Sequence, residues 1–196
     1  PHAGATAHSG AGRIGRLRMR PMTLSERGVG TPEVSLADLL SGSRPTLAAT
    51  SAMRLADYAE EVLASGYPAF RSLSPRALRF QLDSYLRNAV DRDVPDQGLN
   101  VRKPESMLAW LRAYASATAT TASYTQILNA ATPGHADKPA RGTATSYRDA
   151  LTSLWLLDPV PAWMPGGSPM TRLGQTPKHH LADPALAARL LGLTVD

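Results

Sequence analysis

One segment, residues 73–95, constrains the fold most, because its apolar side chains recur at the spacing of a single helix face. Ser74 is expected to cap this helix, with Pro75 at the first helical position and Pro95 at the end. Ala and Leu dominate and aromatic residues make up only 6%, which favours helices packed through small side chains. The residues expected on the buried face are Leu78, Leu82, Tyr85, Leu86 and Ala89.

Other segments show the same helical spacing. Residues 35–42 and 50–66 each begin at hydroxyl side chains that can cap a helix and end at a glycine, with Gly66 expected just past the second helix. Residues 16–20 differ, because Leu17 and Met19 alternate with arginines there, which predicts a short strand ended by proline. Further helices are expected to begin at Pro104, near Ser123, near Thr143 and at Pro184.

Composition excludes several classes of protein. Without Cys the chain has neither a disulfide framework nor a thiolate metal site. No apolar run approaches the roughly 18 residues of a membrane span, and no signal peptide is visible, so we expect a cytoplasmic protein that does not enter membranes. The net charge of +5 is compatible with a polyanionic partner, although Arg-rich and Ala-rich chains also reach such charges for compositional reasons.

The stretch "LWLLD" (Leu154–Asp158) has two interpretations. It is either the metal-holding end of a nucleotide-site strand or the tail of a helix. The first interpretation requires an upstream phosphate-binding loop of the form G-x-x-x-x-G-K-[ST], and the dipeptide Gly-Lys does not occur in this chain. The sequence therefore predicts the end of a helix, with its leucines in the core.

The second half of the chain has the element order of a winged helix-turn-helix. A short and a long helix follow the helix that begins at Pro104, and a hairpin with Gly166 and Gly167 at its tip comes after them. In that fold the start of the third helix faces DNA, where hydroxyls bond phosphates or bases and an Arg can bond guanine. The predicted DNA contacts are Thr143, Thr145, Ser146 and Arg148 on this helix, and Arg172 and Lys178 on the hairpin.

Two alternatives stay open for this second half. Winged helices also bind proteins, and one Arg near the start of the third helix is little for reading a DNA sequence, so a protein partner or self-association competes with double-stranded DNA. A catalytic function is the third hypothesis. His179 and His180 are interpreted as structural rather than as metal ligands, because adjacent histidines point in different directions in a strand.

Short motifs form a pattern along nearly the whole chain. Residues 65–70 read "SGYPAF", and residues 177–186 read "PKHHLADPAL", which contains Pro-Lys and Asp-x-x-Leu. Together they resemble the domain of unknown function 4143, which follows an AAA-type P-loop ATPase core in bacterial ATP-binding proteins. The other residues that match are Pro21, Met22, Thr23, Glu26, Tyr85, Arg92, Asp93, Pro177, Lys178, Asp183 and Leu186.

The resemblance implies a fragment of a larger ATP-binding protein. ATP and Mg would bind in the full-length parent and no cofactor in this fragment, because the Walker motifs would lie upstream and a nuclease-like core downstream. The expected fold is mainly α, a helical lid bundle followed by a winged helix, with short β segments from the ATPase edge and the wing. The expected domains are the ATPase edge (1–30), the lid (31–98), the winged helix (99–170) and the start of the nuclease-like region (171–196).

Overall fold

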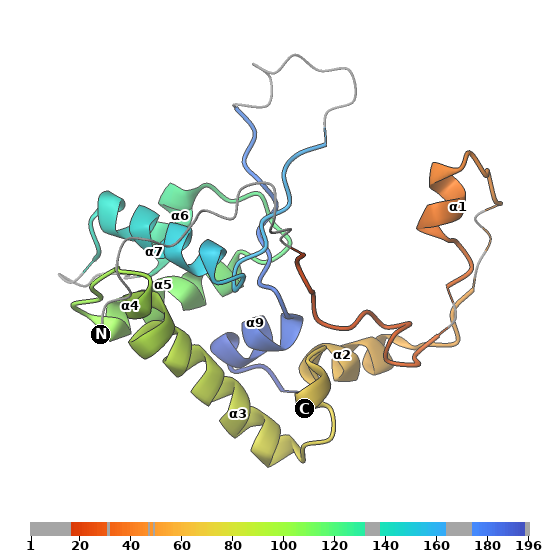
Figure 1. Cartoon of the computed structure of the whole chain (residues 1–196), viewed down its shortest axis with the longest axis horizontal. Helices are drawn as coiled ribbons and strands as arrows, with labels where there is room; N and C mark the ends of the chain where they lie inside the picture. The colour runs from red at the N-terminus through yellow and green to blue at the C-terminus, as the bar shows by residue number, and fades with distance from the viewer. Residues whose placement is uncertain are drawn as a thin grey trace, which may run out of the picture.

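The computed structural model describes residues 17–30, 32–46, 48, 50–131, 138–163 and 174–194. This part of the chain is mainly helical, as expected, and contains no sheet and no helix that is long and apolar enough to cross a membrane. Figure 1 shows most helices gathered in one body, with α1 standing apart. In chain order the helices are α1 (Leu36–Leu40), α2 (Leu55–Leu63), the 3₁₀ turn η1 (Pro68–Phe70), α3 (Pro75–Asn88), the π turn η2 (Ala89–Asp93), α4 (Val94–Asp96), α5 (Pro104–Ser116), α6 (Tyr124–Ala131), α7 (Arg141–Ser153) and α9 (Pro184–Leu191).

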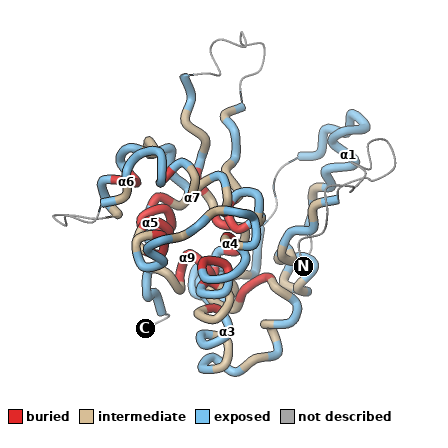
Figure 2. Tube along the Cα trace, turned by 60° about the vertical axis from the view of Figure 1, so that its left-hand side comes forward, coloured by how far each residue is buried: buried red, intermediate tan, exposed pale blue. Residues whose placement is uncertain are grey.

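Helix α5 lies at the centre of the core. Its Trp110 and Tyr114 are at most 1% exposed, and α6, α7 and α9 all contact it. In Figure 2 the buried residues gather around α5 and α9. The expected apolar side of this helix is confirmed, since Met107, Leu108, Leu111 and Ala115 are all buried.

Helix α3 confirms the strongest prediction from the sequence. The Ser74 hydroxyl accepts a hydrogen bond from the Ala77 amide, and Leu82 and Leu86 are buried. Both α2 and α3 pack on α9, a helix from the other end of the chain. A two-bond ion pair between Arg189 of α9 and Asp83 of α3, with both N–O distances 2.7 Å, supports this contact.

The helical path continues one residue past Pro95, where an end was expected. It widens into the π turn η2 and resumes as α4, with Pro95 in the first turn. Pro95 has no amide hydrogen, so the continuous path makes one hydrogen bond fewer at this position. Burial of Val90 and Val94 on the core side holds this continuation in place.

The ends of α2 also differ from expectation. The helix starts at Leu55 rather than near residue 51, and the Asp57 carboxylate accepts a hydrogen bond from the Arg54 amide at 2.7 Å at this start. At the other end Ser65, not Gly66, adopts the left-handed conformation, with a φ of 66°. A side chain at Gly66 would collide with its neighbours: an added Cβ would lie 2.8 Å from the Cβ of Pro21 and 2.9 Å from the backbone oxygen of Met22.

The strand predicted for residues 16–20 is wrong for the described part of that segment. Residues 17–20 are extended without a strand partner, and Leu17 and Met19 are 91% and 88% exposed. Arg18 and Arg20 face the body instead, because both bind the carboxylate of Asp158. Ion pairs with Asp158 therefore set the orientation of this segment. The alternation of apolar and basic residues in the sequence does not reveal these ion pairs, because Asp158 is distant in the chain.

The stretch "LWLLD" follows a helix rather than forming its end, so the predicted helical tail is wrong for these residues. Helix α7 ends at Ser153, and Trp155 turns the chain with a φ of 62°. Leu156 and Leu157 are 1% exposed. Two isolated antiparallel bridges join the chain here to the segment before α9, Leu157 with Leu181 and Val160 with Lys178. The proposed tip of this hairpin, Gly166 and Gly167, lies outside the described residues.

Candidate functional site

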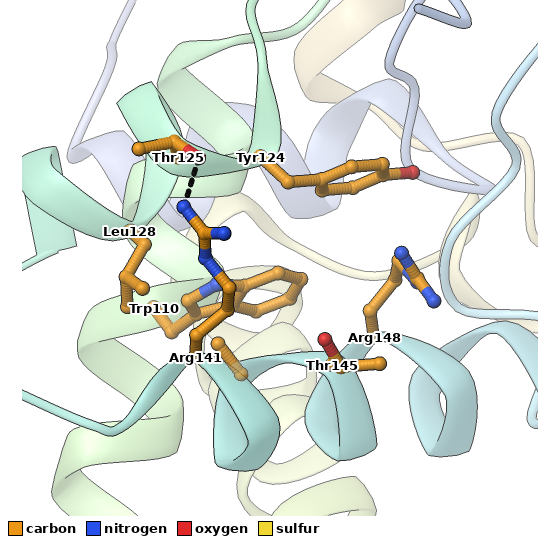
Figure 3. A pocket seen from close by; sticks show the side chains of 8 residues that line it. Trp110, Tyr124, Thr125, Leu128, Arg141, Thr145 and Arg148 are labelled. Carbon is orange, nitrogen blue, oxygen red and sulfur yellow. Dashed lines mark hydrogen bonds between the residues drawn. The ribbon is translucent and has the colours of Figure 1, made fainter.

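Helix α7 borders a hollow of about 220 Å³ that it shares with α5 and α6. Trp110, Leu128 and Ala144 give it an apolar lining, while Tyr124 and Thr125 come from the start of α6. Figure 3 shows two arginine side chains of α7, one on each side of Thr145, reaching into the same space. The lining residues from α7 are Arg141, Ala144, Thr145 and Arg148.

Both arginines of this hollow already have partners. The Nη2 group of Arg141 donates to the Thr125 hydroxyl at 3.2 Å. The guanidinium of Arg148 lies 4.9 Å from the centre of the Tyr124 ring and donates to Asp149 at 2.8 Å. Burial raises the pKa of the Tyr124 hydroxyl, and the positive charge of Arg148 opposes that shift. An anion entering the hollow would therefore compete with Asp149 for Arg148.

A second hollow, of about 520 Å³, lies along other residues of α7 and the start of α5. Three cations line it: Arg102 and Lys103 directly before α5, and Lys138 before α7. Lys138 also bonds the side chain of Asn129. The remaining polar lining consists of the hydroxyls of Ser106, Thr143, Ser146 and Tyr147 and the amide of Asn100.

The residues predicted to bind DNA are thus divided between two hollows. Thr145 and Arg148 line the first, while Thr143 and Ser146 line the second. The hydroxyl of Ser146 donates to the backbone oxygen of Gly142 at 3.1 Å. Lys178 is exposed and lies on the hairpin, where its backbone pairs with Val160 at 2.8 and 2.9 Å. The remaining predicted residue, Arg172, lies outside the described residues.

Sequence reasoning missed four cations beside α7, namely Arg102, Lys103, Lys138 and Arg141. The signal that could have revealed them is a basic residue next to proline at a helix start, in "RKP" and in "KPAR". Arg141 was missed because the polar run before Thr143 conceals the start of α7 at Arg141, while Lys138 lies in the loop before that helix.

His179 is a core residue, in agreement with the structural interpretation. It is fully buried, its Nε2 atom lies 2.7 Å from the backbone oxygen of Ala122, and its ring packs against Tyr114 and Tyr124. Within the described ranges no group of three His, Asp or Glu residues is arranged to hold a metal ion.

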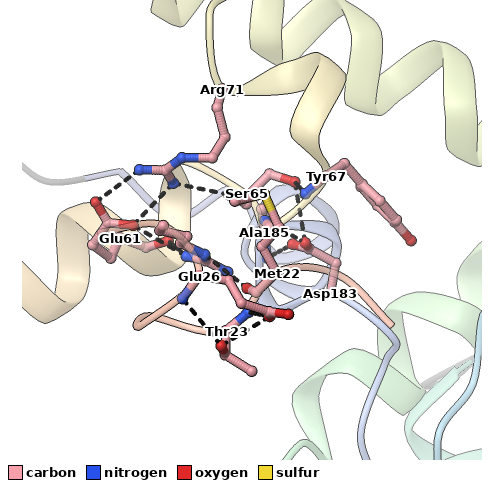
Figure 4. A network of polar contacts seen from close by, with 11 residues as sticks. Met22, Thr23, Glu26, Glu61, Ser65, Tyr67, Arg71, Asp183 and Ala185 are labelled. Carbon is pink, nitrogen blue, oxygen red and sulfur yellow. Dashed lines mark hydrogen bonds and ion pairs between the residues drawn. The ribbon is translucent and has the colours of Figure 1, made fainter. Parts of the chain in front are cut away.

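Motif residues far apart in the sequence meet in a second polar cluster, drawn in Figure 4. The buried carboxylate of Asp183 accepts hydrogen bonds from the Gly66 amide at 2.6 Å and the Ser65 hydroxyl at 3.1 Å. Its other oxygen caps α9 through the Ala185 amide at 2.7 Å. The backbone oxygen of Gly66 in turn accepts from the Met22 amide at 2.7 Å. This cluster joins three segments of the chain.

Two arginines extend that cluster to α2. Arg71 and Arg27 both donate to the carboxylate of Glu61, at 2.9 and 3.1 Å. The hydrogen bond from Arg71 is the main reason why the pKa of Glu61 lies below its usual value. Arg27 also donates to the backbone oxygens of Met22 and Glu61. The cluster therefore links α2, α9 and the segment around Met22.

A family model described as a domain of unknown function (DUF8612) matches residues 55–196. The chain belongs to this family. No curated protein and no solved structure matches it. The DUF8612 match covers α2 to α9 and includes both hollows beside α7 as well as Asp183.

The DUF8612 match corrects the family expected from the sequence. The assignment to the domain of unknown function 4143 and to an AAA-type ATPase is wrong, because the matching family is a different one. The short motifs that carried the resemblance are explained by structure instead: Gly66 and Asp183 bond each other, and Glu26 accepts from the amide and hydroxyl of Thr23. Such contacts are compatible with many folds, so these motifs identify no family. The expected binding of ATP and Mg in a larger parent and the expected nuclease-like region rested on that resemblance, so no observation supports them now.

Proposed function

We propose that residues 104–182 form a winged helix that binds double-stranded DNA along α7. The order of elements supports this: α5, the short α6 and the longer α7 are followed by two segments joined by antiparallel bridges. The contacts between α5, α6 and α7 are those of a three-helix unit.

The observation that carries the proposal is the position of the cations. Arg141 and Arg148 line the hollow shared with α6, while Arg102, Lys103 and Lys138 line the hollow shared with α5. Positive side chains therefore border α7 on two sides, which suits a helix lying between phosphate backbones. The exposed residues at its start, Gly142, Thr143 and Thr145, have small side chains that permit a close approach.

The test is fluorescence anisotropy of a labelled DNA duplex with the full chain at several salt concentrations. Affinity should fall with salt, each lost phosphate contact removing about 0.9 from the slope of log affinity against log salt. Arg102→Ala should reduce this slope, and Arg148→Ala should cost about 1–3 kcal/mol of binding if it bonds a base. Arg76→Ala removes an exposed charge from α3, away from both hollows, and should change nothing.

Asp149→Asn gives a second readout, because it removes the carboxylate that holds Arg148. The variant should bind DNA more tightly, since a competing negative charge leaves the interface. If wild type shows no binding at about 50 mM salt, or if Arg102→Ala and Arg76→Ala behave alike, DNA binding along α7 is refuted. The winged helix would then be a protein-interaction module.

A further inference from the structure

Helix α1 has an apolar face that nothing covers. Leu36, Leu39 and Leu40 are 70%, 44% and 81% exposed, and no residue of α1 is buried. Their spacing places them on one side of the helix. Figure 1 shows α1 well away from the body of the molecule. Isolated helices shorter than about 12–15 residues are marginal in water, so this five-residue helix requires a docking surface to persist.

A groove of about 330 Å³ between α2, α3 and α9 offers such a surface. Its lining is rich in half-buried and exposed apolar side chains, and Arg79 on α3 stands among them. In the described part of the chain Arg79 is exposed and has no ion-pair partner. The apolar lining consists of Leu63, Ala64, Phe70, Leu73, Pro75, Leu78, Leu82, Ala185 and Leu193.

We propose that α1 docks into this groove of its own chain, with its three leucines on the apolar lining. The chemistry of the two surfaces is complementary in a second respect. Glu33 and Asp38 are exposed acids in and beside α1. The charged residues that line the groove are three arginines, Arg71, Arg79 and Arg189, and one acid, Glu60, so the lining carries an excess of positive charge. Docking would bring opposite charges together at the edge of an apolar contact, as in other helix-in-groove complexes.

The connection between the two parts allows this contact. Residues 41–54 separate α1 from α2, and an extended chain of that length spans up to about 45 Å. The groove is lined by the last residues of α2, while the tether joins this helix at Leu55, about 12 Å away along its axis, which is well within the reach of the tether. A short tether gives the tethered helix an effective concentration at the groove of the order of millimolar. At micromolar protein, the groove should therefore bind the α1 of its own chain rather than the α1 of a second copy.

The experiment uses the absence of cysteine from the chain. Ser43→Cys, placed just after α1, carries a nitroxide spin label in the full chain, and broadening of leucine methyl signals is measured by NMR. We expect broadening of Leu63, Leu78 and Leu193 in the groove. Adding Leu39→Asp should abolish it, because a charge replaces an apolar contact.

A matched control removes an exposed leucine that does not line the groove. Leu55→Asp alters a residue of α2 that is 86% exposed, and the broadening should persist. The proposal is overturned if groove signals stay sharp in the labelled parent, or if Leu39→Asp leaves them broad. It is also overturned if the broadening disappears on tenfold dilution, which would identify a second copy as the source of α1.

Discussion

The buried carboxylate of Asp183 should be among the most sensitive positions in the molecule. It is 0% exposed and accepts three hydrogen bonds, from Ser65, from Gly66 and from Ala185 at the start of α9. Asp183→Ala leaves these donors buried without an acceptor. Two of the bonds join segments more than a hundred positions apart in sequence, so their loss also loosens the packing of α9.

The expected magnitude follows from these contacts. Loss of a helix N-cap costs about 1 kcal/mol, and loss of a hydrogen bond to a charged group about 1.5–3 kcal/mol. One cap and two such bonds give about 4–7 kcal/mol, and relief of the cost of burying the carboxylate offsets part of it. We expect Asp183→Ala to lower the free energy of unfolding by about 3–5 kcal/mol, and Asp183→Asn, which keeps one acceptor oxygen, by less.

The assay is equilibrium urea unfolding, followed by the fluorescence of the chain's tryptophans, of which Trp110 is buried. Asp96→Ala, at an exposed aspartate of α4, is the control and should stay within about 0.5 kcal/mol of the parent. A loss below about 1 kcal/mol in Asp183→Ala would refute the reasoning, because it would mean that the three donors find other acceptors.

Two further predictions concern contacts that residues 17–30 make with the rest of the chain. Gly66→Ala should lower the free energy of unfolding by about 1–3 kcal/mol in the same assay, because the added methyl group collides with Pro21 and Met22. A change near zero would mean that Pro21 and Met22 move aside without cost, and it would contradict this prediction. Arg20→Ala should raise the pKa of Asp158, measured by carboxyl NMR titration, because the hydrogen bond from Arg20 is the main cause that holds this pKa below its usual value. The ion pair of Arg20 and Asp158 therefore stabilises the fold at a pH above the ordinary carboxyl pKa, and this stabilisation is lost as the pH falls through the lowered pKa of Asp158. An unchanged pKa of Asp158 in Arg20→Ala would contradict the pairing.

Local signals in the sequence predicted the helices well. Ser35, Ser74 and Ser123 each accept a hydrogen bond from an amide in the first turn of a helix, and Pro75 and Pro104 occupy first helical positions. Capping and proline geometry act over three or four residues, so the sequence alone reveals them. Helical spacing likewise predicted the apolar side of α5.

Contacts between distant residues could not be predicted in this way. Arg20 and Asp158 are 138 positions apart, and nothing local to either one indicates the other. The role of Gly66 depends on the close approach of Pro21, which depends on tertiary packing. The candidate site was found only in part for the same reason. Arg148 belongs to α7 itself, whereas Arg102 comes near this helix only because α5 packs against α7.

The anchoring of residues 17–30 has a practical consequence for any shortened version of this protein. The family match begins at residue 55, yet Arg18 covers the Trp155 ring at 4.4 Å and Met22 bonds the backbone of Gly66. A fragment cut at the family boundary would retain α2 to α9 but gain a bare indole face and an unpaired carboxylate at Asp158. For expression and crystallisation, the cutting point should therefore lie before residue 17.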